Sequence, residues 1–337
     1  MKLLSICDPT KYKSLPLDVP SFYDRLSLDS RIDFYHMPMP QVFRKLLPKV
    51  RAVSSSGKLD YDRFVALSDN DSQWINLQDI DVVFCRTLKP FPSGYLDRLT
   101  MWEQYTRFVN SPSNKKEQIK PDFLLNIAQD YIPEGIITQE WTEALAFFEQ
   151  FSTIVAKQAN SCGGRGVFKI WYQNGVFYVD NFIAGERTFG EFSEVMNYLQ
   201  GGQTEAIQFY RYLNRTDAGD KRVVVVDGEI YGSYLRRSKS GHWVNNVSHD
   251  GECILADITT DEVEAIEHTV KHYQELGLHT LGYDFLLDDD GTWRISEINA
   301  GNIGGFARLE LLTGQPVMNR LIDWLLEYSQ SQLAISK

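Results

Sequence analysis

The sequence predicts an open α/β layer followed by α+β units built on antiparallel strands. Short apolar strands alternate with helical stretches in residues 1–110, where the strand candidates are 3–7, 34–37 and 82–85. Beyond about residue 120 the strands come in pairs joined by tight turns, which is typical of antiparallel hairpins. The chain has 337 residues, 43% of them hydrophobic. It can therefore bury a core that is divided among two or three compact units.

Composition excludes several classes of protein. The apolar stretch at 3–7 is too short for a signal peptide, and no stretch reaches the roughly 18 apolar residues of a membrane span. The 4 cysteines have no CxxC spacing, which argues against a zinc cage or a disulfide framework. The formal charge of −11 comes without a dense basic patch, so nucleic acid is not an expected partner. We expect a cytoplasmic protein without membrane contact, in which a local site can still bind a small anion.

The middle of the chain is expected to combine helices with hairpins. Its elements are, in order, a helix at 122–130, a strand at 135–138, a helix at 142–151 and strands at 152–157, 167–172 and 176–182. The first of these hairpins contains a glycine-rich loop at 159–166. The second turns at Asn174-Gly175, a pair that favours two-residue turns.

The last third is expected to hold two more hairpins with a helix between them. Its elements are strands at 221–226 and 229–235, a helix at 261–276 and strands at 281–287 and 292–298. Asp227-Gly228 turns the first hairpin. Thr259 and Glu262 have the spacing of a capping box, and Gly277 ends the helix.

Three oxygen donors converge on the last hairpin. If its turn has two or four residues, Asp284 faces Ile295, and Glu297 and Asn299 share a face with Asp284. Glu297 is then a diagonal neighbour of Asp284 at roughly 7–8 Å. Carboxylate and amide oxygens suit Mg²⁺, which takes its remaining ligands from water and phosphates. The alternative is a solvated strand edge with ordinary surface carboxylates.

Lys157 ends a strand just before Gly163-Gly164-Arg165-Gly166. A flexible loop with exposed N–H groups can close over phosphates. It is not a P-loop, because the GxxxxGK[ST] order is absent and a strand follows. A plain hairpin turn beside a solvated lysine is the alternative interpretation.

Arginines stand at the ends of the hairpin that turns at Asp227-Gly228. Arg222 begins one strand and Arg236 ends its partner, and strand-end arginines can clamp a phosphoryl group. A regular register places the two on opposite faces, so a shared site requires a bulge. Surface charge explains them equally well.

Taken in order, these motifs resemble the ATP-grasp superfamily and, within it, prokaryotic glutathione synthetase. The resemblance covers nearly the whole chain, and its most specific string is 219–229, GDKRVVVVDGE. The other segments that carry it are Cys7-Asp8-Pro9, Ser21-Phe22, Asp81-Val82-Val83, Arg86, Pro90-Phe91, Val109-Asn110-Ser111-Pro112, 133–138, 154–157, 163–168, Gly282-Tyr283-Asp284 and Glu297-Ile298-Asn299.

This resemblance implies an ATP-grasp fold preceded by an open α/β pre-ATP-grasp domain. The expected units are a substrate-side domain at 1–110, a nucleotide-clamping subdomain at 111–210 and a C-terminal subdomain with the metal site at 211–332. The implied activity joins a small-molecule or peptide carboxylate to an amine through an acyl-phosphate and releases ADP. ATP is the co-substrate, Mg²⁺ or Mn²⁺ is the metal, and a homo-oligomer is expected.

The resemblance also assigns residues to roles. Asp284, Glu297 and Asn299 take the metal positions, Arg222 steadies the transferred phosphoryl group, and Arg236 stabilises the oxyanion. The nucleotide set is Lys120, Lys157, Gly163, Gly164, Gly166, Tyr210, Tyr212, Leu213 and Asp220, with Lys115 or Lys116 as alternatives to Lys120. The substrate set is Arg86, Gly304 and Gly305.

The chain departs from the family where acceptor carboxylates are held. Val244 replaces an arginine before the Asn246 position, and 300–305 replaces a Thr/Ser-Pro segment, although its glycine amides could still bind a carboxylate. The substrates are therefore open between γ-glutamylcysteine with glycine and those of another peptide or amino-acid ligase, of the glutamate-adding or natural-product type. A non-catalytic, synapsin-like ATP-binding module is a third interpretation, which the intact metal set disfavours.

Overall fold

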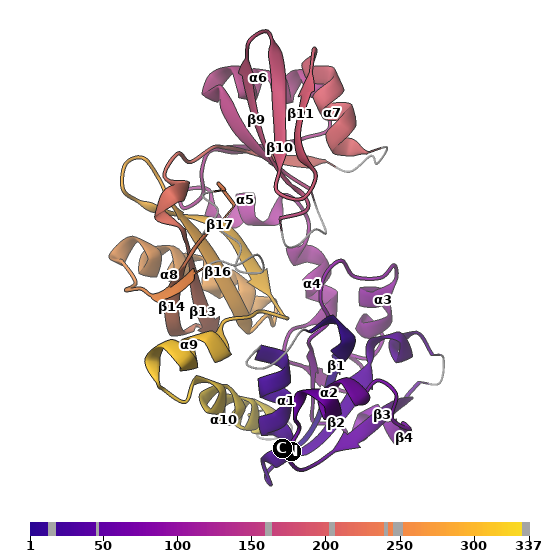
Figure 1. Ribbon diagram of the computed structural model, residues 1–337. Coiled ribbons are helices and arrows are strands. Elements are labelled where there is room, and N and C mark those ends of the chain that lie inside the picture. Colours follow the sequence, from indigo (N-terminus) through magenta and orange to yellow (C-terminus); the bar gives the residue numbers. More distant parts are fainter. Residues whose placement is uncertain are drawn as a thin grey trace.

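The computed structural model describes residues 1–12, 18–44, 47–158, 164–201, 206–238, 242–244 and 252–331. The strands in these ranges form three sheets, and each sheet carries its own helices (Figure 1). The predicted fold class is confirmed, because the N-terminal sheet contains parallel strands while the other two sheets are antiparallel. No helix in the described ranges has both the length and the apolar character that a membrane span needs.

The N-terminal sheet has the strand order β4-β3-β2-β1-β5-β6. Its elements are β1 (Lys2–Cys7), β2 (Asp33–Pro38), β3 (Lys49–Ser55), β4 (Gln73–Asn76), β5 (Val82–Cys85), β6 (Arg107–Phe108), α1 (Asp18–Leu28), α2 (Tyr61–Ala66) and α3 (Tyr95–Thr100). Leu3 packs with residues of α1 and Leu4 with residues of α3. The central strand β1 is thus buried on both faces, as an apolar parallel strand requires.

The second sheet has the order β11-β10-β9-β8-β12-β7. Its elements are β7 (Gly135–Thr138), α6 (Trp141–Phe151), β8 (Thr153–Lys157), β9 (Val167–Gln173), β10 (Val176–Asn181), β11 (Gly185–Phe189), α7 (Phe192–Gln200) and β12 (Ile207–Arg211). Asn174 and Gly175 have φ of 54° and 85°, as the predicted two-residue turn requires. One face of the sheet packs against α6 and α7, so residues of the other face are available for a site.

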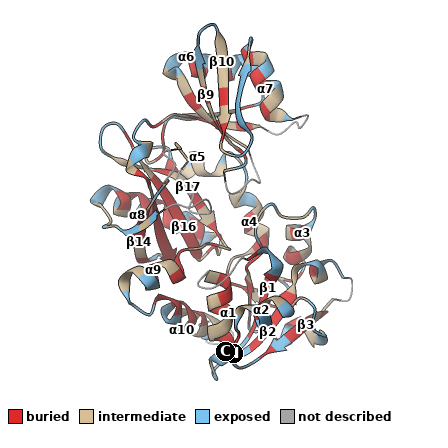
Figure 2. Cartoon of the chain, viewed as in Figure 1, coloured by how far each residue is buried: buried red, intermediate tan, exposed pale blue. Residues whose placement is uncertain are grey.

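The third sheet has the order β15-β14-β13-β16-β17. Its elements are β13 (Asp220–Val226), β14 (Glu229–Arg237), β15 (Glu252–Leu255), α8 (Thr260–Glu275), β16 (Thr280–Leu287), β17 (Trp293–Ala300), α9 (Phe306–Thr313) and α10 (Val317–Gln330). Val223 packs with α8 and Val224 with α9 and α10, which buries β13 between two helical layers. The neighbouring strand β16 also runs through the buried centre (Figure 2). The capping box of Thr259 and Glu262 is confirmed.

Helix α5 (Phe123–Ala128) packs on the third sheet rather than the second, and α4 (Pro112–Gln118) lies between α3 and the third sheet. Ala128 and Ile132 share a core with Tyr283 of β16. We therefore propose that the nucleotide-clamping unit begins near residue 133, later than the expected boundary at 111.

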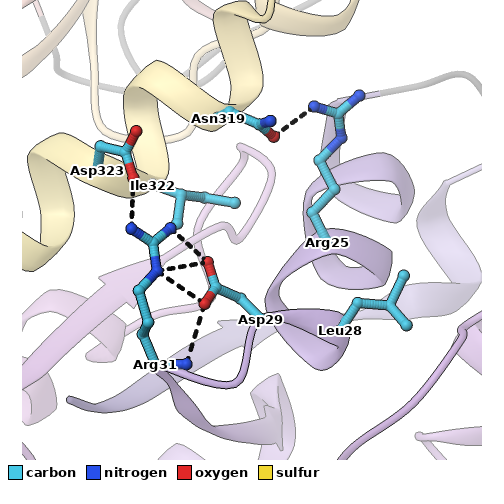
Figure 3. A pocket seen from close by; sticks show the side chains of 7 residues that line it. All are labelled: Arg25, Leu28, Asp29, Arg31, Asn319, Ile322 and Asp323. Carbon is cyan, nitrogen blue, oxygen red and sulfur yellow. Dashed lines mark hydrogen bonds and ion pairs between the residues drawn. The ribbon is translucent and has the colours of Figure 1, made fainter.

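Charged side chains join the N-terminal unit to the end of the chain. Arg25 on α1 donates through Nη1 to Asn319 Oδ1 of α10 at 2.7 Å. Arg31 pairs with Asp29 at 2.6 Å and with Asp323 of α10 at 2.8 Å. These residues line a surface pocket of about 380 Å³ (Figure 3). Arg31 pairs with Asp29 and Asp323, and Arg25 pairs with Glu310 of α9, so we assign this pocket a structural role.

Candidate active site

A cavity of about 450 Å³ lies between the second and third sheets. Residues of β8 and β12 form one wall, and residues of β13, β14, β16 and β17 form the other. The predicted site residues that line it are Lys120, Lys157, Gly164, Gly166, Tyr210, Tyr212, Leu213, Asp220, Arg222, Arg236, Asp284, Glu297, Asn299 and Gly304. Arg86 and Gly305 are not among its lining residues, and Gly163 lies outside the described residues.

The three predicted metal ligands share one face of the last hairpin. Asp284 pairs directly with Glu297, because a β-bulge separates Asp284 from Phe285 in the register. The predicted pairing of Asp284 with Ile295 is therefore wrong: Ser296 is the extra residue of β17, and Ile295 pairs with Phe285 instead. The bulge makes Asp284 and Glu297 direct cross-strand partners instead of diagonal neighbours, and Asn299 Nδ2 donates to Asp284 Oδ2 at 3.3 Å.

The oxygen donors of Asp284, Glu297 and Asn299 suit a metal ion that takes its other ligands from water and phosphate. The described residues contain no group of three or more His, Cys, Asp or Glu side chains that could hold a metal ion. Two carboxylates and one amide are fewer than a closed protein cage provides, but they match Mg²⁺ bound jointly with phosphates. In the described part of the chain, no cation forms an ion pair with Glu297, whose side chain is exposed to the cavity.

A second bulge brings both arginines to the same carboxylate. The register of β13 and β14 shifts between Val224 and Val225, so Arg236 faces Asp220 and Arg222 faces Tyr234. The bulge that a shared site for Arg222 and Arg236 requires is therefore present. Arg222 donates to Asp284 Oδ1 at 2.6 Å and Oδ2 at 2.9 Å, and Arg236 Nη2 donates to Oδ1 at 2.6 Å.

Burial and the neighbouring arginines shift the pKa values of Asp284 and Asp220. Burial opposes ionisation of Asp284, but Arg222 and Arg236 outweigh it and lower its pKa. At Asp220 burial dominates over Arg236 and raises the pKa to about 6. Asp284 is therefore held ionised, whereas Asp220 titrates at about pH 6.

Lys157 crosses from the second sheet to the third. Its Nζ donates to the carbonyl oxygen of Ser296, the bulge residue, at 2.6 Å, and lies 5.1 Å from the ring centre of Tyr210. Burial lowers the pKa of Lys157, and the carboxylates of Glu297 and Asp284 oppose that shift. This half-buried cation stands beside the carboxylate pair, where an anionic ligand would compensate its desolvation.

Of the three alternative phosphate lysines, Lys120 lines the cavity, where it pairs with Glu117 at 2.5 Å. Lys115 is buried and donates to Ala300 O at 2.9 Å, and Lys116 pairs with Asp97. The position of Lys120 thus agrees with its predicted role, which stays a prediction.

Two supports of the cavity escaped the sequence analysis. Arg211, between two tyrosines of the predicted adenine site, pairs with Asp288 at 2.8 Å and links β12 to the end of β16. Asn181 Nδ2 donates to the carbonyl oxygens of Gly164 at 3.1 Å and Val167 at 2.9 Å, and so holds the described part of the glycine loop. Asp288 lies in an Asp-Asp-Asp-Gly string that indicates only a turn, and an asparagine at a strand end gives no signal of its partners.

A sequence profile of the family described as "Prokaryotic glutathione synthetase, ATP-grasp domain" matches residues 123–314. This span is more than half of the chain and contains the cavity residues from Lys157 to Asn299. The chain belongs to this family. It is an ATP-grasp carboxylate–amine ligase that resembles glutathione synthetase.

Relatives of this ligase are distant in sequence but extend over most of its length. It is 24% identical to the glutathione synthetase of Synechocystis sp. over 258 residues, which are 75% of this chain and 74% of the relative. It is 22% identical to that of Prochlorococcus marinus subsp. pastoris over 332 residues, 97% of this chain and 99% of the relative.

Solved structures share the fold of the ligase. D-cycloserine synthetase DcsG gives a TM-score of 0.64 at 14% identity, covering 98% of this chain and 100% of that one. D-alanyl-alanine synthetase A from Vibrio cholerae gives 0.62 at 14%, covering 99% and 98%. ATP-grasp ligase PsnB, complexed with a phosphomimetic variant of its minimal precursor, Mg and ADP, gives 0.57 at 15%, covering 97% and 98%.

The substrate side of the ligase is held by its own side chains. Arg86 is 2% exposed, and its Nη2 donates to Ile303 O at 2.9 Å. The Gly305 amide, which was expected to offer a donor to a carboxylate, donates to Asp18 Oδ2 at 2.8 Å. Arg86 and Gly305 thus shape the loop that borders the cavity.

Val244, at the position of the family's arginine, also lines the cavity of the ligase. Its neighbour Trp243 donates through Nε1 to Asp180 of β10 at 2.5 Å, so this segment reaches the second sheet. The Asn246 position lies outside the described residues.

Proposed function

We propose that this ligase uses ATP and Mg²⁺ to phosphorylate a donor carboxylate and then transfers the acyl group to an amine, releasing ADP and phosphate. The observation that carries the proposal is the row of Arg222, Asp284 and Glu297 across three adjacent strands, with Lys157 reaching it from the opposite wall. Two cations and two carboxylates in one cavity suit the transfer of a charged phosphoryl group, which depends on positioning and electrostatic stabilisation.

Asp284, Glu297 and Asn299 would hold the metal. Glu297 has no ion-pair partner among the described residues, and the donor set is small. Both features support this assignment, since they leave room for phosphate oxygens. When bound, the ion supplies Lewis-acid stabilisation of charge on the phosphates. Mn²⁺ can replace Mg²⁺ at such oxygen ligands.

The nucleotide would extend from residues 210–213, the proposed adenine-binding hinge, to the carboxylates of Asp284 and Glu297. Tyr210, Tyr212 and Leu213 would border the adenine, and Lys120 and Lys157 would bind phosphate oxygens. The glycine loop, with Gly163, Gly164 and Gly166, would approach the phosphates through its amides. Asp220 would stand beside the nucleotide, where its pairing with Arg236 couples it to the reacting end.

The arginines would serve two successive steps. Arg222 neutralises charge on the phosphoryl group while the donor oxygen forms its bond to phosphorus and the bond to ADP breaks. The amine then attacks the acyl carbon, and Arg236 stabilises the oxyanion before phosphate leaves. Both guanidinium groups already converge on Asp284, so a small movement of either redirects it to a phosphate.

The relatives named glutathione synthetase suggest γ-glutamylcysteine and glycine as the first pair to test, and the complexes of PsnB with precursor peptides suggest peptides as a second class. We assign the ligase to the cytoplasm and expect it to act as a homo-oligomer.

An oxygen-18 experiment tests the chemistry directly. Carboxylate donors labelled with oxygen-18 are paired with amines, and released ADP, AMP and labelled phosphate are measured. We expect ADP and labelled phosphate, because amine attack at carbon expels the donor oxygen with phosphorus. Label in AMP would instead identify an adenylating ligase. Tight ATP binding without product from any pair would favour the non-catalytic alternative.

A further inference from the structure

Residues of the loop that follows β17 border the cavity. Gly304 lines the cavity, and Arg222 donates through Nη1 to its carbonyl oxygen at 3.1 Å. The same guanidinium group contacts Asp284, so the Arg222 side chain bridges Gly304 and the Asp284 carboxylate. A substrate group beside Gly304 therefore lies next to the reacting centre.

Asp18 occupies the amides on the other side of this loop. Its Oδ2 accepts from the Gly305 amide at 2.8 Å and its Oδ1 accepts from the Ala307 amide at 2.7 Å. Both carboxylate oxygens are thus engaged at the N-terminal end of α9. This end attracts anions because its amides are unpaired within the helix and its dipole is positive there. The chain's own carboxylate satisfies that attraction.

Asp18 also lies close to the cavity wall. A Cβ atom added to Gly304 would be 3.1 Å from Asp18 Oδ2, so the carboxylate lies directly against a residue that lines the cavity. Charges at such short range interact strongly in a partly buried site. A substrate carboxylate beside Gly304 would be repelled and would find the Gly305 and Ala307 amides already engaged. Val244 adds an apolar side chain to the same cavity.

We propose that Asp18 sets the acceptor specificity of this ligase, and that the acceptor is an amine without a free carboxylate on the adjacent carbon. The inference rests on the proposed function. The donor carboxylate must approach the cations Arg222 and Lys157, which compensate its charge. The amine approaches the acyl carbon from the side that Gly304 borders, where a neutral or cationic group is favoured by Asp18.

Matched acceptors test this selectivity. Release of ADP is measured with the most active donor of the oxygen-18 experiment and with acceptors that differ only in the carboxyl group, glycine against glycinamide and alanine against alaninamide. We expect the amides to exceed the acids by at least tenfold in kcat/KM. In Asp18→Asn the preference should fall by at least tenfold, mainly through a lower KM for the acids, because the like charge is removed.

Asp24→Asn is the matched control, since Asp24 on the same helix accepts from the Leu59 amide at 2.6 Å but does not line the cavity. It should keep the wild-type preference. Thermal unfolding of both variants identifies any general loss of structure, and Asp18→Glu, which restores the charge, should restore discrimination. Equal or better use of the free acids by the wild type would overturn the assignment of Asp18 alone. Absence of ADP with every donor and acceptor would overturn the proposed function and, with it, this inference.

Discussion

Arg236 on β14 reaches across β13 to Asp284 on β16, with 2.6 Å between Nη2 and Oδ1. Since Arg222 also donates to this carboxylate, a cation that binds Asp284 competes with two guanidinium groups. A phosphate group that attracts both arginines removes that competition. Binding of metal and binding of nucleotide are therefore expected to strengthen each other, and this coupling is reciprocal.

The first prediction concerns that coupling. Mn²⁺ titration of the wild type should give an affinity at least about tenfold higher in the presence of a non-hydrolysable ATP analogue. Glu297→Gln should lose most of this gain and lower turnover by at least about 100-fold, because it removes one ligand charge. Glu267→Gln on the exposed side of α8 serves as control. Unchanged turnover of Glu297→Gln at limiting Mg²⁺ would refute the metal assignment.

The second prediction separates activity from stability at Lys157. Burial lowers the pKa of this lysine from the ordinary value of 10.5, so the folded state disfavours its charged form at neutral pH. This cost is relieved as the pH rises through the lowered pKa toward 10.5. Lys157→Met should therefore keep or raise the melting temperature at pH 7 while turnover falls by roughly 100-fold. A marked drop in melting temperature would show that Lys157 stabilises the fold.

The third prediction uses the pKa of Asp220, which burial raises from 3.8 to about 6. A raised carboxyl pKa contributes stability that is complete below pH 3.8 and is lost as the pH rises through about 6. Asp220→Asn lacks this loss. Urea unfolding at pH 5 and pH 8 should therefore show the variant gaining relative to the wild type at the higher pH. The same difference at both pH values would contradict the assignment.

The fourth prediction concerns the support of the hinge. Asp288 is buried and paired with Arg211 and Arg294. Asp288→Asn should cost about 2 kcal/mol in the free energy of unfolding, because Arg211 and Arg294 lose the buried carboxylate that they share. They keep only their exposed partners Glu134 and Asp290. The KM for ATP should also rise, because Arg211 lies between Tyr210 and Tyr212. The exposed neighbour variant Asp289→Asn should change the free energy by no more than about 0.5 kcal/mol.

The hairpins and the shared face of the proposed metal ligands could be predicted from local sequence patterns. Asn174-Gly175 and Asp227-Gly228 fix two hairpins because their turns require left-handed backbone. Alternation then assigned Asp284, Glu297 and Asn299 to one face. It failed at the bulge residue Ser296, because an extra residue shifts the register without changing the pattern of residue types.

Other features depend on packing between distant segments. Asp18 and Ala307 are 289 positions apart, and Arg211 and Asp288 are 77 apart, so no local pattern connects them. Likewise α5 precedes the second sheet in the chain but packs on the third. Sequence order alone gives no sign of this packing.

The contacts along β17 have a consequence for association with other chains. β17 is the last strand of its sheet, and such a strand normally exposes a row of backbone groups on which another strand can pair. Here the carbonyl oxygens of Ile298 and Ala300 accept from Gln118 and Lys115, and Lys157 bonds to that of Ser296. The edge is therefore capped by side chains. Strand-by-strand aggregation is blocked at the same backbone that carries Glu297 and Asn299, the proposed metal ligands.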